Sequence, residues 1–172
     1  MPDQKHILSP SLIFICLGNI CRSPLAEGIC REELRHRGLA DQFSVSSAGT
    51  GRWHVGEPPH RGSVGVAKKF GLDISTQRSQ HMSYYHLDKI PWIIALDEQN
   101  RKDILNSYPN LRQRSEPIWL LRQFENSGSG DAPPRGVPDP YYGHGDQAFV
   151  EVYHIIKSAC EGLVSYISKA PE

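Results

Sequence analysis

A single apolar segment, Leu12–Cys16, places the strictest limit on what this 172-residue chain can fold into. Its sequence, LIFIC, is a continuous apolar run, which is typical of a strand that is covered on both faces. A short loop ending at Ser23 then leads into a helix, for which Ser23 is predicted as the hydroxyl N-cap and Pro24 as the first helical residue. A buried strand that passes so directly into a helix predicts a parallel sheet with helical crossovers.

The rest of the chain continues this alternation of strands and helices. Apolar runs and punctuating Gly, Pro and Asp residues predict strands over 43–48, 92–96 and 116–120, and helices over 23–37, 60–70, 97–107 and 146–168. Gly38 is predicted to end the first helix, and Asp97 is predicted to cap the third. The expected fold class is therefore α/β, a four-stranded parallel sheet with helices on both faces and a phosphate-binding loop after the first strand.

The length of the chain fits one domain, 1–172, which can bury enough surface to need no metal or disulfide for stability. We expect the two ends, 1–6 and 170–172, to fray. The segment 125–138 is rich in Gly, Ser and Pro, and these residues predict a flexible surface loop inside the domain.

The composition argues against several classes of function. Lys and Arg total 19, as do Asp and Glu, so no overall basic charge favours nonspecific binding to nucleic acid. The longest apolar run, from Leu12 to Leu17, is far shorter than the roughly 20 residues that span a bilayer. Four cysteines are too few for a disulfide scaffold, and the N-terminus lacks the apolar core of a signal peptide. We therefore expect a cytoplasmic protein that binds neither nucleic acid nor membrane.

The loop after the first strand has the composition of a phosphate site. Gly18 and Asn19 tolerate left-handed backbone conformations, which allow several amide N–H groups to converge beside the positive end of the helix. Arg22 adds a planar fork that can hold two phosphate oxygens at once. The predicted phosphate-binding residues are Leu17, Gly18, Asn19, Ile20, Cys21, Arg22 and Ser23.

Cys16 lies at the base of this loop, where the positive potential favours a thiolate nucleophile facing the bound phosphorus. The alternative is a buried apolar residue that ends a strand, which is the common role of a lone cysteine. The C-x5-R-S spacing between a strand and a helix that starts with Pro24 favours the nucleophile.

Thiolate attack on a phosphate ester needs a proton donor for the departing oxygen, and Asp139 is the candidate. It stands in the segment VPDPYYG, where two prolines restrict the backbone and Tyr141 and Tyr142 can form the wall of a site for a flat substrate. A solvated aspartate in a turn is the alternative interpretation, and the tyrosine pair favours the acid.

Three motifs resemble the low-molecular-weight protein tyrosine phosphatases: the N-terminal CLGNICRSPLAE, the middle LDEQN and the late DPYYG, which match that family in order and approximate spacing. The resemblance implies a phosphotyrosine hydrolase with a cysteinyl-phosphate intermediate and no metal or cofactor. It implies that Cys16 is the nucleophile, Arg22 the phosphate clamp and Asp139 the general acid. It also implies that Asn19 supports the loop and that the Ser23 hydroxyl binds the thiolate. Trp53, Tyr141 and Tyr142 match the aromatic rim that grips the substrate ring.

The chain departs from the family pattern in two places. The segment 77–80 reads QRSQ, whereas family members often have a histidine and two arginines there, and the loop before Asp139 is longer than usual. Three other functions fit the same loop: a protein arginine phosphatase, an arsenate reductase and a noncatalytic phosphopeptide-binding module. A protein arginine phosphatase is expected to have threonine in place of Ile20. An arsenate reductase is expected to have further cysteines between 31 and 159, where this chain has none. A noncatalytic phosphopeptide-binding module could lack Cys16 or Asp139, and both residues are present in this chain.

The remaining residues capable of metal or redox chemistry divide into two groups. Eight histidines show no metal-ligand spacing, so no metal site is predicted, and Cys30 and Cys160 fall on predicted helix faces and are expected in the core. Cys21 lies in the loop five residues after Cys16, where it is either a packing residue or a redox partner of the nucleophile. The expected partners are phosphotyrosine-containing proteins, and the sequence leaves the oligomeric state open.

Overall fold

The computed structural model describes residues 10–126, 129–130, 132–143 and 145–170. The predicted fraying of 1–6 and 171–172 lies outside these residues, as do three positions of the predicted loop 125–138. The described residues of that loop form neither a helix nor a strand. Its flexibility stays a prediction.

The four predicted strands form one parallel sheet, which confirms the expected fold class. Its strands are β1 (Leu12–Cys16), β2 (Val45–Gly49), β3 (Trp92–Ala95) and β4 (Trp119–Leu120), arranged in the order β2-β1-β3-β4. β1 pairs with β2 on one side and β3 on the other, so the loop that follows Cys16 leaves the middle of the sheet. A central strand places its loop among the carboxyl ends of its neighbours, where parallel sheets bind ligands.

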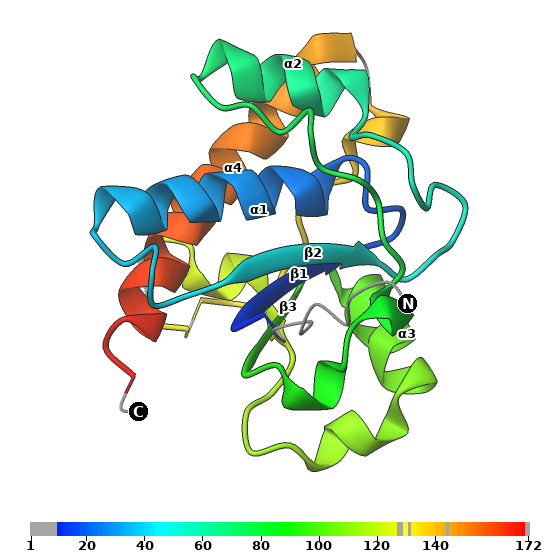
Figure 1. Cartoon of the computed structure of the whole chain (residues 1–172), viewed down its shortest axis with the longest axis vertical. Coiled ribbons are helices and arrows are strands. Elements are labelled where there is room, and N and C mark those ends of the chain that lie inside the picture. Colours follow the sequence, from blue (N-terminus) through cyan, green and yellow to red (C-terminus); the bar gives the residue numbers. More distant parts are fainter. Residues whose placement is uncertain (1–9, 127–128, 131, 144, 171–172) are drawn as a thin grey trace, which may run out of the picture.

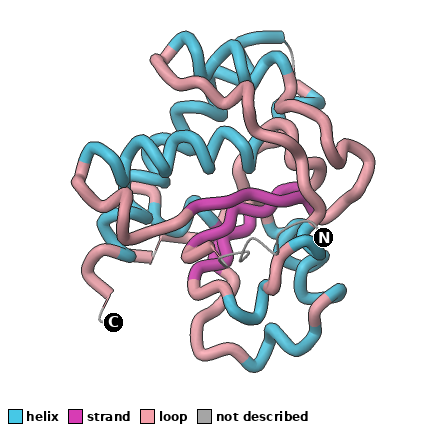
Figure 2. The backbone as a smooth tube through the Cα atoms, viewed as in Figure 1, coloured by secondary structure: helices cyan, strands magenta, loops and turns pink. Residues whose placement is uncertain are grey.

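Helices cover both faces of this sheet, as predicted. They are α1 (Arg22–His36), α2 (Arg61–Lys69), α3 (Glu98–Ser107) and α4 (Gly145–Ile167), and the short 3₁₀ helices are η1 (Met82–Tyr84), η2 (Leu87–Lys89), η3 (Pro109–Gln113), η4 (Leu121–Phe124) and η5 (Pro140–Tyr142). Figure 1 shows α1, α2 and α4 on one side of the sheet and α3 on the other. The same three layers appear in Figure 2, where the strands lie between the two groups of helices.

The alternation of side chains along β1 divides the core between the two faces. Leu12, Phe14 and Cys16 pack in the cluster that includes α1 and α4, whereas Ile13 and Ile15 pack in the cluster on the side of α3. All five are buried, as the unbroken apolar run predicts. Cys30 and Cys160 are also fully buried, which confirms their place in the core.

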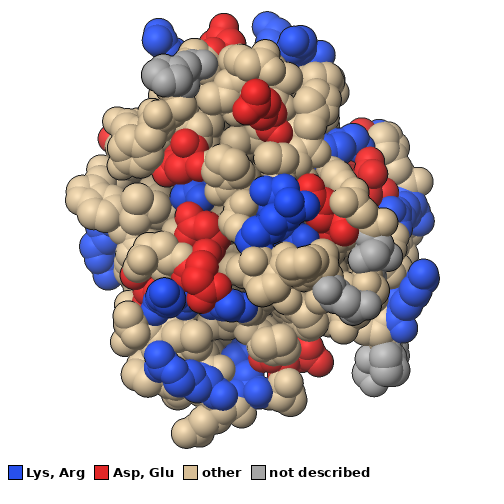
Figure 3. Space-filling view, turned by 180° about the vertical axis from the view of Figure 1, so that it is seen from behind, with Lys and Arg blue, Asp and Glu red and all other residues tan. Residues whose placement is uncertain are grey.

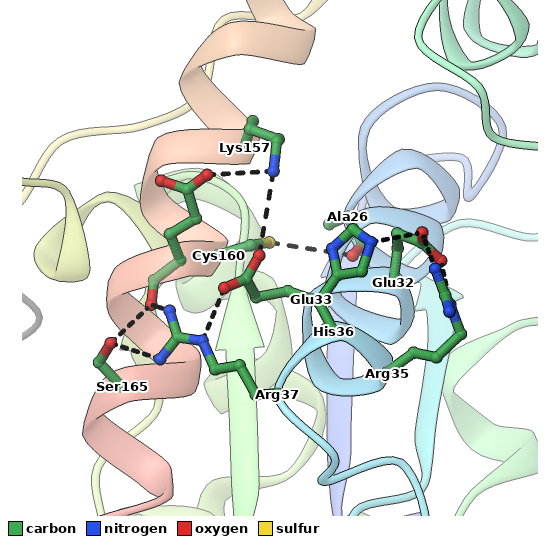
Figure 4. Close-up of polar contacts among 10 residues, drawn as sticks. Ala26, Glu32, Glu33, Arg35, His36, Arg37, Lys157, Cys160 and Ser165 are labelled. Atoms are coloured by element: carbon green, nitrogen blue, oxygen red, sulfur yellow. Dashed lines mark hydrogen bonds and ion pairs between the residues drawn. The ribbon is translucent and has the colours of Figure 1, made fainter.

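One ion pair and hydrogen bonds from Arg37 link α1 and its C-terminal end to α4 (Figure 4). Arg37 donates to Glu33 over 2.6 Å and to Ser165 of α4 over 2.7 Å, and Lys157 of α4 lies 3.0 Å from Glu161 and 3.9 Å from Glu33. Such partly exposed pairs add little stability, so apolar packing holds the two helices together. Elsewhere the two signs of charge are interspersed, as on the face in Figure 3.

The start of α1 corrects one prediction. The helix begins at Arg22, its N-cap position is Cys21, and no side chain caps it, so the assignment of Ser23 as N-cap is wrong. The physical reason is that the Ser23 hydroxyl contacts Cys16 Sγ. Gly38 follows the end of the helix with φ at 70°, a left-handed conformation that glycine adopts without strain, and this confirms the predicted stop.

Other element boundaries differ from the predictions by a few residues. β2 and β4 begin two and three residues later than predicted, because strand pairing and not side-chain type decides where a ladder starts. The helix predicted over 60–70 spans Arg61–Lys69, and the imidazole of His60 caps it by accepting from the amide of Gly62. The prediction that Asp97 caps α3 is confirmed, since its Oδ1 accepts from the amide of Asn100 over 2.7 Å.

Candidate active site

The sulfur of Cys16 lies at the floor of the loop that joins β1 to α1. The amide of Asn19 donates to Sγ over 3.3 Å, and the Ser23 hydroxyl lies 2.9 Å from it. Asn19 has φ at 55°, the left-handed conformation that turns the chain so that its amide faces the sulfur. The loop thus brings an amide and a hydroxyl to the sulfur of a residue that is 2% exposed, which holds the sulfur in one position at the floor of the loop.

The side chain of Asn19 supports the loop from below. Its amide nitrogen donates to Ser23 Oγ over 2.8 Å and to Ser47 Oγ of β2 over 2.9 Å. Its carbonyl oxygen accepts from the backbone amide of Gln80 over 2.8 Å. Because Asn19, Ser23 and Ser47 are buried, the side chain of Asn19 holds one orientation and fixes the loop against two other segments of the chain.

The segment that departs from the family pattern, 77–80, lies against this loop. Ser79 Oγ donates to the carbonyl of Gly18 over 3.0 Å, and Gln77 Nε2 donates to the carbonyl of Pro24 over 3.1 Å. The contact that Gln80 makes with Asn19 uses its backbone, which any residue except proline could supply. The segment therefore supports the loop without a histidine.

Gly49, at the end of β2, is a close neighbour of the loop that the sequence analysis missed. A Cβ atom at this position would lie 2.8 Å from the carbonyl oxygen of Leu17 and 3.2 Å from the amide nitrogen of Asn19. Only glycine allows the strand end to approach so closely. The register that pairs Cys16 with Gly49 could have pointed to this requirement, but register is not visible in the sequence.

A hydrogen bond from Arg31 of α1 holds the edge strand β2 next to Ser47. Arg31 donates to the carbonyl of Val45 over 2.6 Å and to Glu27 Oε1 over 3.3 Å. Burial raises the pKa of Glu27 to about 7, against the opposing effects of Arg31 and of the Ser47 backbone. The edge strand is thus held in place where Ser47 supports Asn19.

Arg22 connects the loop to two distant carboxylates. It is 3% exposed and donates to Asp97 Oδ2 over 2.6 Å, to the carbonyl of Val137 over 3.0 Å and to Asp139 Oδ2 over 3.5 Å. Burial alone would lower the pKa of Arg22, but the negative charges of Cys16, Asp97 and Asp139 raise it. The guanidinium is therefore held charged and oriented at the side of the loop.

Asp97 was predicted only as a helix cap, and its second role was missed. One of its carboxylate oxygens caps α3 while the other accepts from Arg22, so this single side chain orients the guanidinium from the end of β3. It stands 75 residues from Arg22, and no local pattern links the two.

Asp139 lies at the mouth of the site, where the sequence analysis expected it. Its Oδ1 accepts from the amide of Tyr141 over 3.1 Å, which makes Asp139 the cap of η5, and its side chain is 24% exposed. The carboxyl group thus faces both solvent and Arg22, a position from which it can exchange a proton with a bound ester.

A cleft of about 230 Å³ opens above Cys16 and brings most of the predicted site residues together. Its lining includes Trp53, Tyr141 and Tyr142, which are all largely exposed and surround the opening. His54, which the sequence analysis did not single out, also lines it. The full lining is Cys16, Leu17, Gly18, Ile20, Cys21, Arg22, Trp53, His54, Asp139, Tyr141 and Tyr142. Among the residues that the structure describes, no group of three His, Cys, Asp or Glu side chains could hold a metal ion.

Cys21 also lines the cleft but is 5% exposed. Burial, together with the negative charges of Cys16 and Asp139, raises the pKa of its thiol to about 12. Cys21 is therefore protonated at neutral pH, which makes it a slow nucleophile.

Comparison with known proteins gives a consistent assignment. Residues 11–172 match the family model described as low molecular weight phosphotyrosine protein phosphatase. The chain is 39% identical over 156 residues to the low molecular weight protein-tyrosine-phosphatase PtpA of Staphylococcus epidermidis, an alignment that covers 91% of this chain and 92% of that protein. It is 38% identical over 159 residues to YfkJ of Bacillus subtilis, which has the same description, with 92% and 96% covered.

The fold also agrees with a solved structure. A protein tyrosine phosphatase from Entamoeba histolytica, crystallised with Hepes in its active site, superposes with a TM-score of 0.81 and 30% identity. That alignment covers 92% of this chain and 96% of the other. Within the described part of the chain, no helix is both long and apolar enough to cross a membrane.

Proposed function

Because the chain belongs to the low molecular weight phosphotyrosine protein phosphatase family, we propose that Cys16, Arg22 and Asp139 carry out its phosphatase reaction in two steps. The observation that carries this assignment is the environment of Cys16 Sγ. An amide and a hydroxyl lie within hydrogen-bond distance of the sulfur, and Arg22 is held beside the same loop.

In the first step the thiolate of Cys16 attacks phosphorus, and the bond between phosphorus and the ester oxygen breaks. Protonated Asp139 gives its proton to the departing oxygen. In the second step Asp139, now a carboxylate, takes a proton from water as the water attacks the phosphocysteine, and the thiolate leaves with inorganic phosphate as the product. The loop amides and Arg22 hold the charge of the equatorial oxygens in both steps.

The shape of the cleft supports phosphotyrosine in proteins as the substrate. Trp53, Tyr141 and Tyr142 offer apolar faces around the opening, and each ring contact with a phenyl group contributes about 1 kcal/mol beyond its buried area. Ile20 adds an aliphatic wall within the loop. Phosphoserine is too short to reach both the loop and this rim.

Matched peptides carrying phosphotyrosine, phosphoserine or phosphoarginine test this proposal. We expect kcat/KM to be highest for phosphotyrosine, because a phenyl ring can contact both Ile20 and the aromatic rim that line the cleft. Replacing Ile20 with threonine is expected to lower the phosphotyrosine rate and narrow its advantage over phosphoarginine. A phosphoarginine rate equal to or above the phosphotyrosine rate in the unaltered enzyme would favour an arginine phosphatase.

We further propose that Cys21 protects Cys16 from peroxide. The sulfenic acid formed at Cys16 would react with the Cys21 thiol to give a disulfide and water, and a reducing thiol would then restore both cysteines. We expect unaltered enzyme to recover its activity after peroxide and then dithiothreitol, and Cys21→Ser to recover little. Because the pKa of Cys21 is raised to about 12, more of its thiolate forms as pH rises, so trapping should be faster at pH 9 than at pH 7.

Mass spectrometry of the oxidised enzyme locates the disulfide. The control is Cys160→Ser, which removes a buried thiol far along the chain and should recover like the unaltered enzyme. Equal recovery of Cys21→Ser and the control would identify Cys21 as a packing residue only.

A further inference from the structure

The segment that leads into Asp139 is fastened to the body of the protein by a group of charged side chains outside the cleft. Arg122 of η4 donates to both carboxylate oxygens of Glu125, over 3.0 and 3.3 Å, and to the carbonyl of Gly136 over 3.1 Å. Arg135 donates to Glu125 from the other side over 2.9 Å. We refer to Arg122, Glu125 and Arg135, with the Gly136 carbonyl, as the loop clamp.

The pair of Arg122 and Glu125 is the less exposed part of the loop clamp, whereas Arg135 is 56% exposed. The side chains of Arg122 and Glu125 are 13% and 11% exposed. Burial by itself would raise the pKa of Glu125, but the hydrogen bonds and charges of Arg122 and Arg135 outweigh it and lower that pKa. The bidentate contact with Glu125 fixes the plane of the Arg122 guanidinium, so Nη1 points at the carbonyl of Gly136.

Gly136 and Val137 pack closely against the end of β3 and the start of α3. A Cβ atom on Gly136 would lie 2.7 Å from Cβ of Asp97, and the amide of Val137 donates to the carbonyl of Leu96 over 2.8 Å. The carbonyl of Val137 accepts from Arg22. The backbone is therefore held at Gly136 by Arg122 and at Val137 by both Leu96 and Arg22. Asp139 follows Val137 by two residues.

We propose that Arg122 is a positioning residue for the phosphatase reaction: through Gly136 it holds the backbone that places the carboxyl group of Asp139 beside the leaving oxygen. This inference rests on the proposed role of Asp139 as the general acid. Thirteen residues separate Glu125 from Asp139, so without Arg122 the placement of the acid would depend on the contacts of Val137 with Leu96 and Arg22.

The test is the dependence of kcat/KM on the leaving group. Phenyl phosphate needs a proton on its departing oxygen, whereas an ester of a strongly acidic phenol, such as dinitrophenyl phosphate, does not. We expect Arg122→Gln to lower kcat/KM for phenyl phosphate about 10-fold or more, since a misplaced catalytic group loses rate steeply, and to change the rate for the acidic ester little. Inhibition by inorganic phosphate should be unchanged, because it reports on the loop and Arg22.

A double variant separates positioning from general stability. If Arg122 acts only through Asp139, Arg122→Gln combined with Asp139→Asn should lose no more activity than Asp139→Asn alone. Arg35→Gln removes an exposed pair with Glu32 in the last turn of α1 and should match the unaltered enzyme. Glu125→Gln, which keeps the size of the side chain, takes the place of Arg122→Gln if that variant does not fold, and a smaller loss in the same direction is expected.

Two results would overturn the inference, and they differ in what else they affect. If Asp139→Asn shows the leaving-group dependence but the clamp variants lose equal activity on all esters, or add their loss to that of Asp139→Asn, then Arg122 does not position the acid and the proposed function stands. If Asp139→Asn itself shows no leaving-group dependence, both the acid assignment and the inference fail.

Discussion

Replacing Cys16 with serine should lower kcat on an aryl phosphate about 10⁴-fold or more, while excess EDTA should leave the unaltered enzyme fully active. In the proposed mechanism the thiolate forms the covalent intermediate, and a serine hydroxyl in the same place is a far weaker nucleophile because it remains protonated. In the same proposal the loop amides and Arg22 supply the positive charge that a metal would otherwise provide. Steady-state kinetics with and without chelator measure both effects.

Cys160→Ser is the matched control for this substitution. It also exchanges a buried sulfur for oxygen, but at the contact of α4 with the carbonyl of Ala26 in α1, and it should keep its activity. Trapping of phosphate on the protein after a rapid quench should label the unaltered enzyme at Cys16. Activity that depends on added Zn²⁺ or Mg²⁺, or that survives in Cys16→Ser, would contradict the mechanism.

Asp139→Asn should lower kcat/KM for phenyl phosphate by about 10²–10⁴, the usual contribution of a positioned general acid. Asparagine keeps the size of the side chain and can still accept from the amide of Tyr141, so the backbone should hold its position. The loss should shrink as the leaving phenol becomes more acidic, because a stable phenolate departs without a proton. A series of substituted phenyl phosphates measures this slope.

Asp41→Asn, at an exposed position outside the cleft, provides the control for the loss of one carboxylate and should match the unaltered enzyme. Inhibition by inorganic phosphate should persist in Asp139→Asn, since Arg22 retains Asp97 and the carbonyl of Val137 as partners. A uniform loss across all leaving groups would show that another group protonates the ester.

Side-chain chemistry and short-range spacing made the centre of the site predictable from the sequence. Cys16, Asn19, Arg22 and Ser23 lie within eight consecutive residues, so a strand before them and a helix after them leave few ways to arrange the loop. The error at Ser23 also has a local cause. A serine before a proline is a frequent N-cap, but a hydroxyl beside a sulfur makes a different contact when the loop turns it inward.

The groups that surround this centre were decided by the tertiary structure alone. Asp97 reaches Arg22 because β3 lies next to β1, and Gly49 approaches the loop because β2 pairs on the other side. These contacts join residues that the sequence separates by up to 75 positions, and the order of the strands has no local signature. Arg122 is a further example, since an arginine in a short helix gives no sign that it will bind the carbonyl of Gly136.

The physical reason for this division is how far apart in the chain the interacting residues lie. The amide directions of a tight loop and the apolar run of a buried strand depend on residues that are neighbours in the chain, so their sequence determines them. The orientation of Arg22, the support of Asn19 and the placement of Asp139 depend on backbone carbonyls and carboxylates that meet only when the sheet assembles. The sequence alone predicted the proposed nucleophile and its loop, and only the assembly of the sheet and its connections decided which distant groups hold them in position.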